Sequence, residues 1–312
     1  MKKNHKYYCS IDVGTNSIHS IIAYVDLKNN LRTVFKHKES IRLGKSMSNK
    51  RIPTQLIDTA ADTISKIKKS AEKFDAEIHA VATSAVREAV NKDEFVDRIL
   101  TKTGVKINVI NGNEEGELIY EGVVSGLKLN DDDFLIIDIG GGSTELISAN
   151  SSDRNVYSLG MGAIRTSMQF FPKFEIESKS LENCLNHLDN ISEQAIKEIN
   201  IAKFKNVIGT SGTIQALGRM IIAQNGGHSK QFIVDEEFSA SDFMEVIDKI
   251  LSISKPSERI MLPGLEKNRA DIIVAGAVIL KFLINRLNIN KIRVTTFALR
   301  EGLIFKNYNK NI

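Results

Sequence analysis

The sequence of 312 residues predicts an α/β protein made of two domains with mixed sheets. Its length corresponds to about two domains of ordinary size. Apolar, strand-like segments alternate with helix-like segments along the whole chain. The segment 11–18 is also repeated at 137–144, where Asp138 follows Asp12 by 126 residues. A repeat of that length indicates two copies of a domain rather than a solenoid.

The first half of the chain opens with strand-forming residues. Segments 7–12, 17–25 and 31–43 predict a three-stranded meander. A helix is expected at 53–74, because Pro53 is well suited to the first turn of a helix. The remaining expected elements are a strand at 78–83, helices at 84–89 and 93–103, a strand at 105–110 and a helix at 112–126.

The second half repeats this plan after a polar run at 130–133. We expect the domain boundary near that run, with domains at 1–128 and 129–298. The expected elements are strands at 134–138 and 145–149, helices at 161–171 and 180–199, a strand at 206–209, helices at 213–224 and 269–288, a strand at 291–295 and a final helix from 299.

The charge balance argues against a dedicated nucleic-acid-binding protein. The net charge is +4, and the basic residues are scattered rather than gathered into a stripe. Lys66, Lys68 and Lys69 are best explained as one solvated helix face. A weak positive balance is compatible with a small polyanionic substrate.

Targeting and redox features favour a cytoplasmic protein that does not bind membranes. The basic N-terminus is not followed by an apolar signal-peptide core. The longest apolar stretch, 272–283, is interrupted by Lys281 and is too short to cross a bilayer. Cys9 and Cys184 lie in no metal-binding or redox spacing, which is typical of reduced thiols in the cytosol.

Both copies of the repeat carry the chemistry of a phosphate cradle. In each copy a strand ends in Asp-x-Gly and continues into a small polar turn, at 14–17 and again at 140–143. Glycine lets the backbone approach an anion and present successive N–H groups, and the aspartate can hold a hydrated Mg²⁺. One such turn is equally well explained as a hairpin without a ligand. Two related copies predict two loops that face each other across a cleft and grip one phosphate chain.

Three acidic residues, Glu114, Glu115 and Glu117, stand at the start of the helix expected at 112–126. Acids at this position are ordinarily explained by their favourable interaction with the helix dipole. Gly112 permits an unusual turn just before them, however. A carboxylate aimed into the cleft from here could act as a general base on a water that attacks phosphorus.

Three further segments contain residues suited to anion contact. Thr83 and Ser84 open a helix, and Arg87, one turn later, can clamp phosphate oxygens. Taken alone, these residues are better explained as a helix cap and a surface arginine. The segment 209–213 is either a third anion nest or a tight turn between strand and helix. Arg269 is expected at the start of a late helix, where it could be structural.

These motifs resemble the exopolyphosphatase and guanosine pentaphosphate phosphatase family, within the actin-like superfamily of sugar kinases, Hsp70 and actin. The matching segments are Asp12-Val-Gly-Thr-Asn-Ser, Ala82-Thr-Ser-Ala-Val-Arg, Gly112-Asn-Glu-Glu-Gly, Asp138-Ile-Gly-Gly-Gly-Ser-Thr-Glu-Leu, Gly160-Met-Gly-Ala-Ile-Arg, Gly209-Thr-Ser-Gly-Thr, Arg269-Ala-Asp and Leu299-Arg-Glu-Gly. They follow the family's order over nearly the whole chain, whose length resembles the family's short form. The resemblance implies two actin-like (ribonuclease H-like) domains, mixed sheets flanked by helices and a cleft between the domains. It also implies that the last helix, about 299–312, packs back on the first domain.

The resemblance assigns roles residue by residue. Glu115 corresponds to the catalytic base, and Asp138 and Glu115 to the metal-binding acids, with Asp12 as an additional candidate ligand. The phosphate-binding positions are Asn16, Ser17, Arg87, Gly140, Gly141, Gly142 and Ser143. Candidate further substrate contacts are Thr15, Thr83, Ser84, Gly209, Ser211, Gly212 and Arg269. Two departures from the family pattern, Thr15 for serine and Gly116 for alanine, are small.

The implied reaction is hydrolysis of terminal phosphoanhydride bonds of polyphosphate with release of orthophosphate. A pppGpp 5′-phosphohydrolase, or an enzyme with both activities, is the close alternative, because both substrates present a terminal triphosphate-like chain. A kinase-like phosphotransferase lacks its acceptor motif here, and Glu115 with Asp138 argues against a non-catalytic nucleotide-binding regulator.

The expected cofactor is Mg²⁺, with another divalent cation or K⁺ as candidates. The expected partners are polyphosphate or a guanosine penta- or tetraphosphate and a second copy of the chain in a homodimer, with no nucleic acid and no membrane.

Overall fold

The structure is a computed structural model that describes residues 5–45, 47, 49–129, 133–150, 153–202, 204–227 and 235–310. The chain divides into two compact units. Unit 1 comprises Met1–Leu129 and Phe297–Ile312, and unit 2 comprises Asn130–Thr296. Most of the polar run expected to mark the boundary, 130–132, lies outside the described residues.

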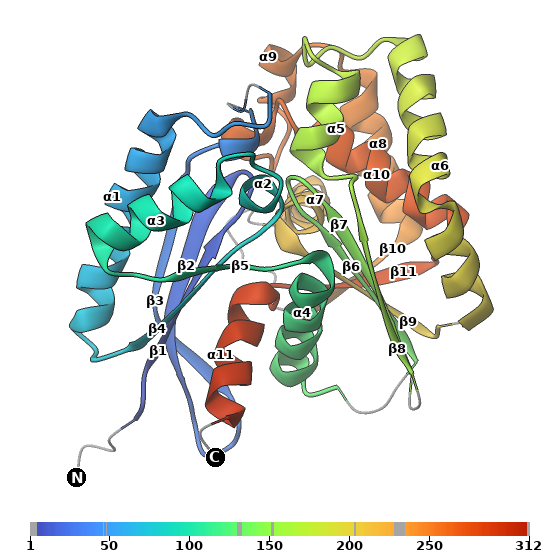
Figure 1. Ribbon diagram of the computed structural model, residues 1–312. Coiled ribbons are helices and arrows are strands. Elements are labelled where there is room, and N and C mark those ends of the chain that lie inside the picture. The colour runs from blue at the N-terminus through green and yellow to red at the C-terminus, as the bar shows by residue number, and fades with distance from the viewer. Residues whose placement is uncertain are drawn as a thin grey trace. The chain divides into compact units, whose positions relative to one another are not determined.

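Unit 1 is built on a five-stranded mixed sheet of order β3-β2-β1-β4-β5 (Figure 1). Its strands are β1 (Tyr8–Val13), β2 (Ser17–Val25), β3 (Leu31–Ser40), β4 (Glu77–Ala82) and β5 (Ile107–Val109). β1 pairs antiparallel with β2 and β2 with β3, which confirms the expected meander, while β4 and β5 run parallel to β1. The alternating apolar residues of β1 and β2 bury both faces of this sheet.

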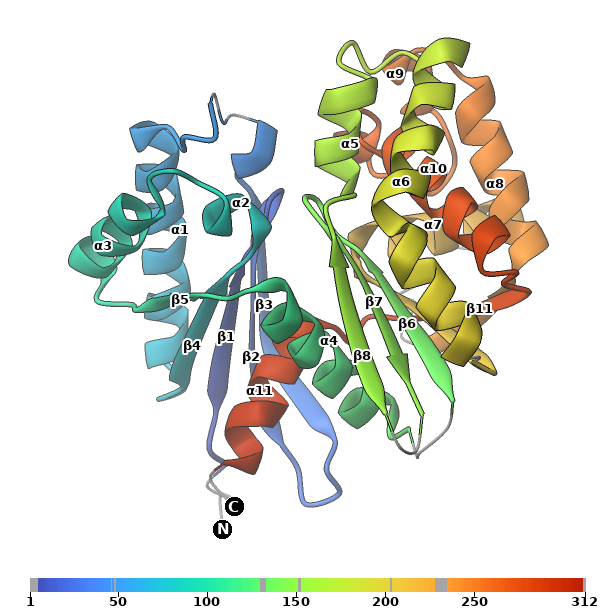
Figure 2. The ribbon, with the colours of Figure 1, turned by 45° about the vertical axis from the view of Figure 1, so that its right-hand side comes forward.

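Helices cover both faces of the unit 1 sheet. They are α1 (Thr54–Glu72), α2 (Ser84–Arg87), α3 (Lys92–Thr103), α4 (Gly112–Leu127) and α11 (Leu299–Asn309), with a 3₁₀ turn η1 (Leu43–Lys45). α1 packs beside α3 over one face, where its apolar side chains join the larger core of the unit. α11 packs against α4, β1 and β2 on the other face, as Figures 1 and 2 both show. The end of the chain thus completes unit 1.

Unit 2 contains a six-stranded mixed sheet of order β10-β11-β9-β6-β7-β8. Its strands are β6 (Phe134–Ile139), β7 (Thr144–Ala149), β8 (Arg154–Leu159), β9 (Asn206–Thr210), β10 (Asp235–Ser239) and β11 (Lys291–Thr295). β6, β7 and β8 form an antiparallel meander, and β9 and β11 run parallel to β6. This is the plan of unit 1 with one additional edge strand, so the duplication predicted by the sequence is confirmed.

The helices of unit 2 lie beside its sheet (Figure 2). Buried apolar side chains of the helices and the sheet form one core. The helices are α5 (Ala163–Phe170), α6 (Ser178–Ala202), α7 (Ser211–Gln224), α8 (Ala240–Ser252), α9 (Pro256–Arg259) and α10 (Ile273–Arg286), with a 3₁₀ turn η2 (Lys267–Arg269). α10 is apolar on nearly every side because α5, α7 and α8 all pack against it. The helix predicted from 269 begins later, because the chain forms η2 there and α10 begins at Ile273.

The two hairpins that carry the repeat have the same register. Asp12 lies opposite His19 across β1 and β2, and Asp138 lies opposite Glu145 across β6 and β7. Both members of the second pair follow their counterparts in the first by 126 residues. The sequence repeat is therefore also a repeat of strand pairing, and it fixes which residue stands beside each aspartate.

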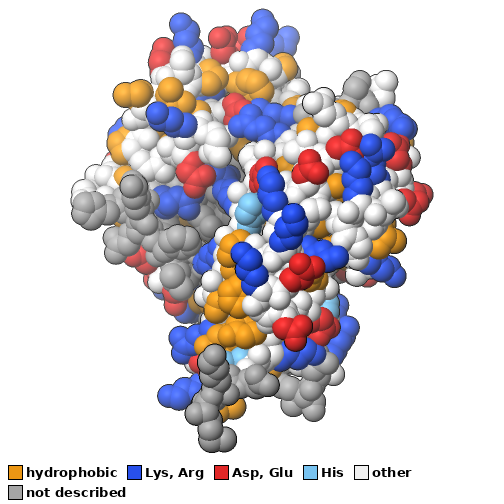
Figure 3. All heavy atoms as spheres, turned by 90° about the vertical axis from the view of Figure 1, so that its left-hand side faces the viewer, with side chains coloured by type: hydrophobic (Ala, Val, Ile, Leu, Met, Phe, Trp, Pro, Cys, Tyr) orange, Lys and Arg blue, Asp and Glu red, His pale blue; other side chains and the backbone are white. Residues whose placement is uncertain are grey.

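The surface carries charges of both signs. On the face drawn in Figure 3, lysine and arginine side chains are interspersed with aspartate and glutamate. Elsewhere in the structure, ion pairs join Arg98 to Asp58 at 2.6 Å and Arg293 to Asp235 at 2.5 Å. No basic stripe of the kind that tracks a nucleic-acid backbone is seen on this face.

Candidate active site

The carboxyl ends of three parallel strands bring the functional segments of unit 1 together. Val13, Ala82 and Val109 are in register at the ends of β1, β4 and β5. The segments that follow them therefore start at one edge of the sheet, which is where open α/β sheets bind ligands. They are the turn 14–17, the start of α2 and the approach to α4.

The turn between β1 and β2 is fixed by hydrogen bonds to its carbonyl groups. The N–H of Gly14 donates to the carbonyl of Ser17 at 3.1 Å. The carbonyl of Asn16 accepts from the N–H groups of Ile41 and Arg42 at 3.1 and 2.8 Å. Since the carbonyl and N–H of a trans peptide point in opposite directions, the N–H of Ser17 is directed away from Ile41 and Arg42.

Hydroxyl groups join this turn to the start of α2. Thr15 Oγ1 and Ser84 Oγ form a buried hydrogen bond of 2.7 Å. The N–H of Thr83 donates to the carbonyl of Val13, which ties the two segments together a second time. Thr15, Thr83 and Ser84 therefore form one polar cluster, although none of them caps α2 through its side chain.

Glu115 and Arg87 form an ion pair at the same edge. Arg87 Nη1 donates to Glu115 Oε2 at 2.9 Å and to the carbonyl of Ile110 at 3.0 Å. The Glu115 side chain is 10% exposed and that of Arg87 is 23% exposed. Because α2 is only four residues long, Arg87 stands at its end rather than one turn inside a longer helix. The pair gives Glu115 a defined orientation.

The neighbouring acid, Glu114, has a different environment. It is exposed, its Oε2 accepts from the N–H of Asn111, and its own N–H donates to Asn111 Oδ1. This reciprocal arrangement is a capping box that satisfies the first turn of α4. Glu114 is thus the acid that serves the helix start, and Glu115 is the one enclosed at the edge of the sheet.

Unit 2 contains the equivalent turn between β6 and β7. The N–H of Gly140 donates to the carbonyl of Ser143 at 3.0 Å, which is the counterpart of the bond from Gly14 to Ser17. A Cβ on Gly140 would lie 3.1 Å from the Ser143 carbonyl oxygen, so this turn favours glycine there. Gly141, Gly142 and Ser143 follow Gly140, so the turn contains three consecutive peptide groups.

Two buried carboxylates stand beside this turn. Asp138 is 4% exposed, and Glu145, its partner across the strand pair, is 1% exposed. Glu145 Oε1 accepts a hydrogen bond of 2.7 Å from Ser158. Glu145 lies within the motif Asp138-Ile-Gly-Gly-Gly-Ser-Thr-Glu-Leu, but no role was predicted for it. The signal that could have identified it is an acidic residue within an otherwise buried strand, adjacent to Asp138 by the hairpin register.

A second turn of unit 2 lies at the same sheet edge, because Asp138 and Thr210 are in register on β6 and β9. Ser211 begins α7 with a positive φ of 68°, which is a strained conformation for serine. A Cβ on Gly212 would come within 2.3 Å of Arg269 Nη2, so the guanidinium packs directly on the start of this helix. Gly209 has no such contact with Arg269, because it is crowded by two isoleucines.

Glu266 links two arginines next to that helix start. It accepts from Arg219 Nη2 at 2.8 Å and from Arg269 Nε at 3.3 Å. Burial lowers the pKa of Arg219, which Glu266 opposes. One carboxylate shared by two guanidinium groups leaves a net positive charge, and the site is therefore suited to an anion.

The candidate residues thus fall into two groups, one in each unit. Unit 1 holds Asp12, Thr15, Asn16, Ser17, Thr83, Ser84, Arg87 and Glu115, and unit 2 holds Asp138, Gly140, Gly141, Gly142, Ser143, Gly209, Ser211, Gly212 and Arg269. The two expected metal-binding acids, Glu115 and Asp138, belong to different units. Within the described part of the chain, no cluster of three or more His, Cys, Asp or Glu side chains is arranged to hold a metal by itself.

Neither cysteine is suited to nucleophilic catalysis. Cys9 and Cys184 are both fully buried, each inside the apolar core of its unit. Burial raises the pKa of each thiol to about 12. Both therefore remain protonated at neutral pH, and the reactive form of cysteine is the thiolate.

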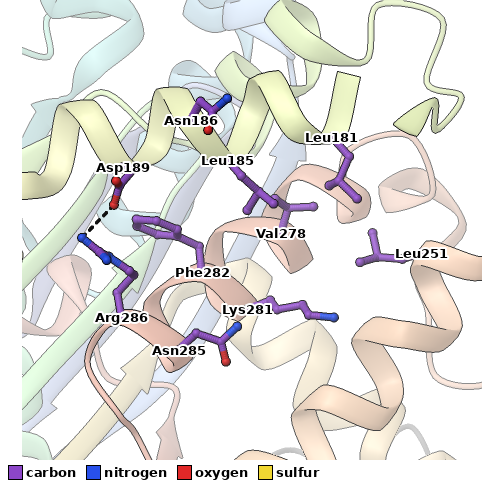
Figure 4. Close-up of a pocket in the computed structure, with 10 residues that line it drawn as sticks. All are labelled: Leu181, Leu185, Asn186, Asp189, Leu251, Val278, Lys281, Phe282, Asn285 and Arg286. Atoms are coloured by element: carbon purple, nitrogen blue, oxygen red, sulfur yellow. Dashed lines mark ion pairs between the residues drawn. The ribbon is translucent and has the colours of Figure 1, made fainter. Parts of the chain in front are cut away.

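A separate cavity of about 460 Å³ lies among α6, α8 and α10 in unit 2 (Figure 4). Its walls are mostly apolar, with Leu181, Leu185 and Phe282 among them. The basic residues at its edge are already paired, Arg286 with Asp189 at 2.9 Å and Lys281 with Asp248 at 2.6 Å. A phosphate chain would find no unpaired cation here, so this cavity does not resemble the phosphate turns.

None of the helices formed by the described residues combines the length and apolar character needed to cross a membrane.

Comparison with known proteins agrees with the motifs in the sequence. A model of the Ppx/GppA phosphatase family matches residues 20–311. A crystal structure of an exopolyphosphatase from Cytophaga hutchinsonii superposes with a TM-score of 0.89 at 27% sequence identity, covering 98% of both chains. A Ppx/GppA family member from Aquifex aeolicus gives a TM-score of 0.81 at 25% identity, again over 98% of both chains.

A curated relative is longer than this chain. The bifunctional 3-dehydroquinate synthase/phosphatase of Fusobacterium nucleatum is 31% identical over 298 residues. The match covers 91% of this chain but only 44% of that relative, so the chain spans less than half of its length. The family model, in contrast, accounts for nearly all of the present sequence, and the resemblance found in the motifs is confirmed: the chain belongs to the Ppx/GppA phosphatase family.

Proposed function

We propose that this chain hydrolyses terminal phosphoanhydride bonds and releases orthophosphate, with polyphosphate as substrate. The observation that carries the proposal is the partly buried ion pair of Glu115 and Arg87, 2.9 Å long, at the sheet edge that also presents the turn 14–17. A duplicated turn in unit 2 supplies the same backbone chemistry. Family membership and the 27% identity to an exopolyphosphatase support the same reaction class.

Glu115 is the proposed general base. In this mechanism its carboxylate orients a water molecule and accepts a proton as the water attacks the terminal phosphorus. Arg87 donates to Glu115 Oε2 through Nη1 and so fixes the orientation of the carboxylate that meets the water. Arg87 also contributes positive charge near the phosphate oxygens. The acceptor role requires Glu115 to be ionised.

The phosphate-binding groups are proposed to be the N–H groups and hydroxyls of the two turns. Asn16 and Ser17 act in unit 1, and Gly141, Gly142 and Ser143 act in unit 2. Backbone N–H groups held in place before the substrate arrives need no reorganisation during the reaction. The hypothesis that both units hold the same phosphate chain remains a prediction.

The donor set in unit 2 is compatible with Mg²⁺. Asp138 and Glu145 are oxygen ligands on neighbouring strands, and Mg²⁺ usually takes one or two carboxylates together with water and phosphate oxygens. We propose that these two residues hold the ion, with Glu115 and Asp12 as candidates from unit 1. When bound, Mg²⁺ would neutralise charge on the phosphate chain.

Guanosine pentaphosphate is the second candidate substrate. Its 5′-triphosphate presents the same terminal phosphoanhydride, and the family model covers phosphatases of both the Ppx and the GppA type. The positively charged group of Arg219, Arg269 and Glu266 favours a substrate with additional phosphate beyond the cleaved bond. A polymer and a nucleotide with a second pyrophosphate both satisfy this condition.

The substrate proposal is tested by measuring orthophosphate release from polyphosphate, pppGpp and ATP in parallel, with Mg²⁺ and with a chelator. We expect release from polyphosphate to be fastest, release from pppGpp to be second, and both to stop in the chelator. Faster release from pppGpp would reverse the order of the two substrates. Full activity in the chelator would rule out the proposed role of Mg²⁺, and no release from any of the three compounds would rule out the proposed reaction.

A further inference from the structure

The phosphate turn of unit 2 is held from behind by the start of α5. The carbonyl of Gly140 accepts from the N–H of Ala163 at 2.9 Å. The carbonyl of Gly141 accepts from the N–H of Ile164 at 2.8 Å. Because each carbonyl points towards α5, the N–H groups of the same peptides, which belong to Gly141 and Gly142, point away from it.

The third peptide of the turn is held by a side chain instead. The carbonyl of Gly142 accepts from Nε of Arg165 at 2.7 Å, the shortest of these three contacts. The N–H of the same peptide belongs to Ser143. Arg165 thereby directs the N–H of Ser143 to the same side as the two N–H groups before it. Among the described residues, no hydrogen bond is donated by these three N–H groups.

This turn needs external support because its sequence provides little of its own. Three successive glycines have wide conformational freedom, so each peptide plane could turn over at small cost. A reversed peptide would present a carbonyl oxygen to a phosphate and repel it. Gly162 permits the required close approach, since a Cβ there would lie 2.4 Å from the carbonyl carbons of Gly141 and Gly142.

Four hydrogen bonds from α5 support the turn, and they differ in how they depend on sequence. Those from the N–H groups of Ala163, Ile164 and Arg165, the last to the carbonyl of Gly141 at 3.2 Å, are main-chain bonds that almost any residue would supply. The Nε–H of Arg165 is a side-chain donor, so substitution can remove it while leaving α5 intact. The orientation of the Ser143 N–H is therefore the one part of this cradle that a single side chain controls.

We propose that Arg165 is a positioning residue for phosphate binding, which acts by holding the Gly142–Ser143 peptide with its N–H towards the substrate. This inference rests on the proposed function of the turn as a phosphate site. The sequence motif Gly160-Met-Gly-Ala-Ile-Arg contains Arg165, but a motif does not show whether this residue acts through its charge or through a hydrogen bond. The structure points to the hydrogen bond, because the contact runs through Nε to a carbonyl.

Three substitutions separate the hydrogen bond from the charge. Arg165→Gln removes the charge but keeps an N–H donor, because the amide nitrogen of glutamine is as many bonds from Cβ as Nε of arginine is. Arg165→Lys keeps the charge but has a methylene group at that position. Arg165→Met is similar in length to glutamine and has neither donor nor charge. Arg286→Met, at the end of α10, is the matched control for loss of an arginine elsewhere in unit 2.

The measurement is direct binding of tripolyphosphate to each variant, in parallel with KM and kcat for phosphate release. We expect Arg165→Gln and Arg286→Met to bind within about threefold of wild type. Arg165→Met and Arg165→Lys should bind roughly 10- to 100-fold more weakly, as for loss of one hydrogen bond to a charged group. The amide resonance of Ser143 should shift with tripolyphosphate in wild type and in Arg165→Gln, but not in Arg165→Met.

The opposite ranking would overturn the inference. If Arg165→Lys retains affinity and Arg165→Gln loses it, Arg165 acts through its charge. If Arg165→Met binds tripolyphosphate as tightly as wild type, Arg165 has no role in binding. Thermal unfolding of all variants identifies loss of affinity that comes from a damaged fold. The affinity measurement does not depend on turnover. These outcomes can therefore still be distinguished if wild type releases no orthophosphate and the proposed reaction fails.

Discussion

Glu115 is the residue on which the proposed chemistry depends most directly. Glu115→Gln keeps the size of the side chain and removes the base. We expect a rate loss on the order of 10²–10⁴, with unchanged or tighter substrate binding because a negative charge beside the phosphates disappears. The measurements are kcat and direct binding of tripolyphosphate. Glu114→Gln is the matched control, since Glu114 serves the capping box of α4, and it should retain most of the activity.

Arg87 should behave differently from Glu115 because it serves both binding and catalysis. Arg87→Ala removes a proposed phosphate contact and also releases Glu115 from its hydrogen bond. We therefore expect both affinity and kcat to fall, in contrast to Glu115→Gln. Arg98→Ala, which breaks the surface pair with Asp58, is the control and should change neither quantity. A loss of affinity alone would show that Arg87 does not orient the base.

The residues identified from the sequence were those that stand in linear motifs. Glu115 and Arg87 were both predicted as site residues, but their mutual hydrogen bond was not, because they are 28 residues apart and belong to different helices. Glu145 and Arg165 also stand in linear motifs, but no role was predicted for them. Their roles depend on a strand register and on a helix that returns to the turn, neither of which a linear pattern contains.

At the scale of elements, α11 and α4 approach each other through glycine. A Cβ on Gly302 would lie 1.7 Å from the carbonyl oxygen of Leu118, and one on Gly122 would lie 2.1 Å from that of Ala298. Gly302→Ala must therefore force the two helices apart. We expect a loss of about 1–3 kcal/mol in unfolding free energy, although alanine normally favours a helix. Thermal and denaturant unfolding measure this loss.

The control for that substitution is Gly160→Ala. A Cβ on Gly160 meets nothing within 4 Å, and the residue has no positive φ. Its unfolding free energy should stay within about 0.5 kcal/mol of wild type, as for substitutions away from tight packing. If Gly302→Ala were equally harmless, the close packing of α11 on α4 would not contribute to stability.

Most elements of the fold could be predicted from periodicity, and the missed strands have physical reasons. β10 has the sequence Asp-Glu-Glu-Phe-Ser, whose exposed acids give no strand signal. It forms because its main chain pairs with β11 at the edge of the sheet. β8 begins with the exposed residues Arg154 and Asn155 and was also missed. The omission of α8 has no such reason, because Ser239 and Asp242 form a capping box and apolar residues follow at helical spacing. Edge elements depend on neighbours that are distant in sequence.

At the scale of the whole molecule, duplication explains why one chain has two similar turns. The order β3-β2-β1-β4-β5 in unit 1 recurs in unit 2 with the additional strand β10. The two copies have diverged in chemistry, because the acid pair Asp138 and Glu145 corresponds to Asp12 and His19 in unit 1. We infer that unit 2 specialised in metal binding and unit 1 in proton transfer. A homodimer and a cytoplasmic location remain predictions, and sedimentation analysis tests the first.

The central claim is that both units act in one reaction. The most direct test is the rate of orthophosphate release from polyphosphate by wild type, by Glu115→Gln in unit 1 and by Asp138→Asn in unit 2, with Mg²⁺ varied for each. We predict that each substitution alone lowers the rate by at least about 100-fold. Asp138→Asn should also weaken the dependence on Mg²⁺. If either variant kept more than about a tenth of the wild-type rate, the unit that carries it would take no essential part in catalysis, and the claim would be contradicted.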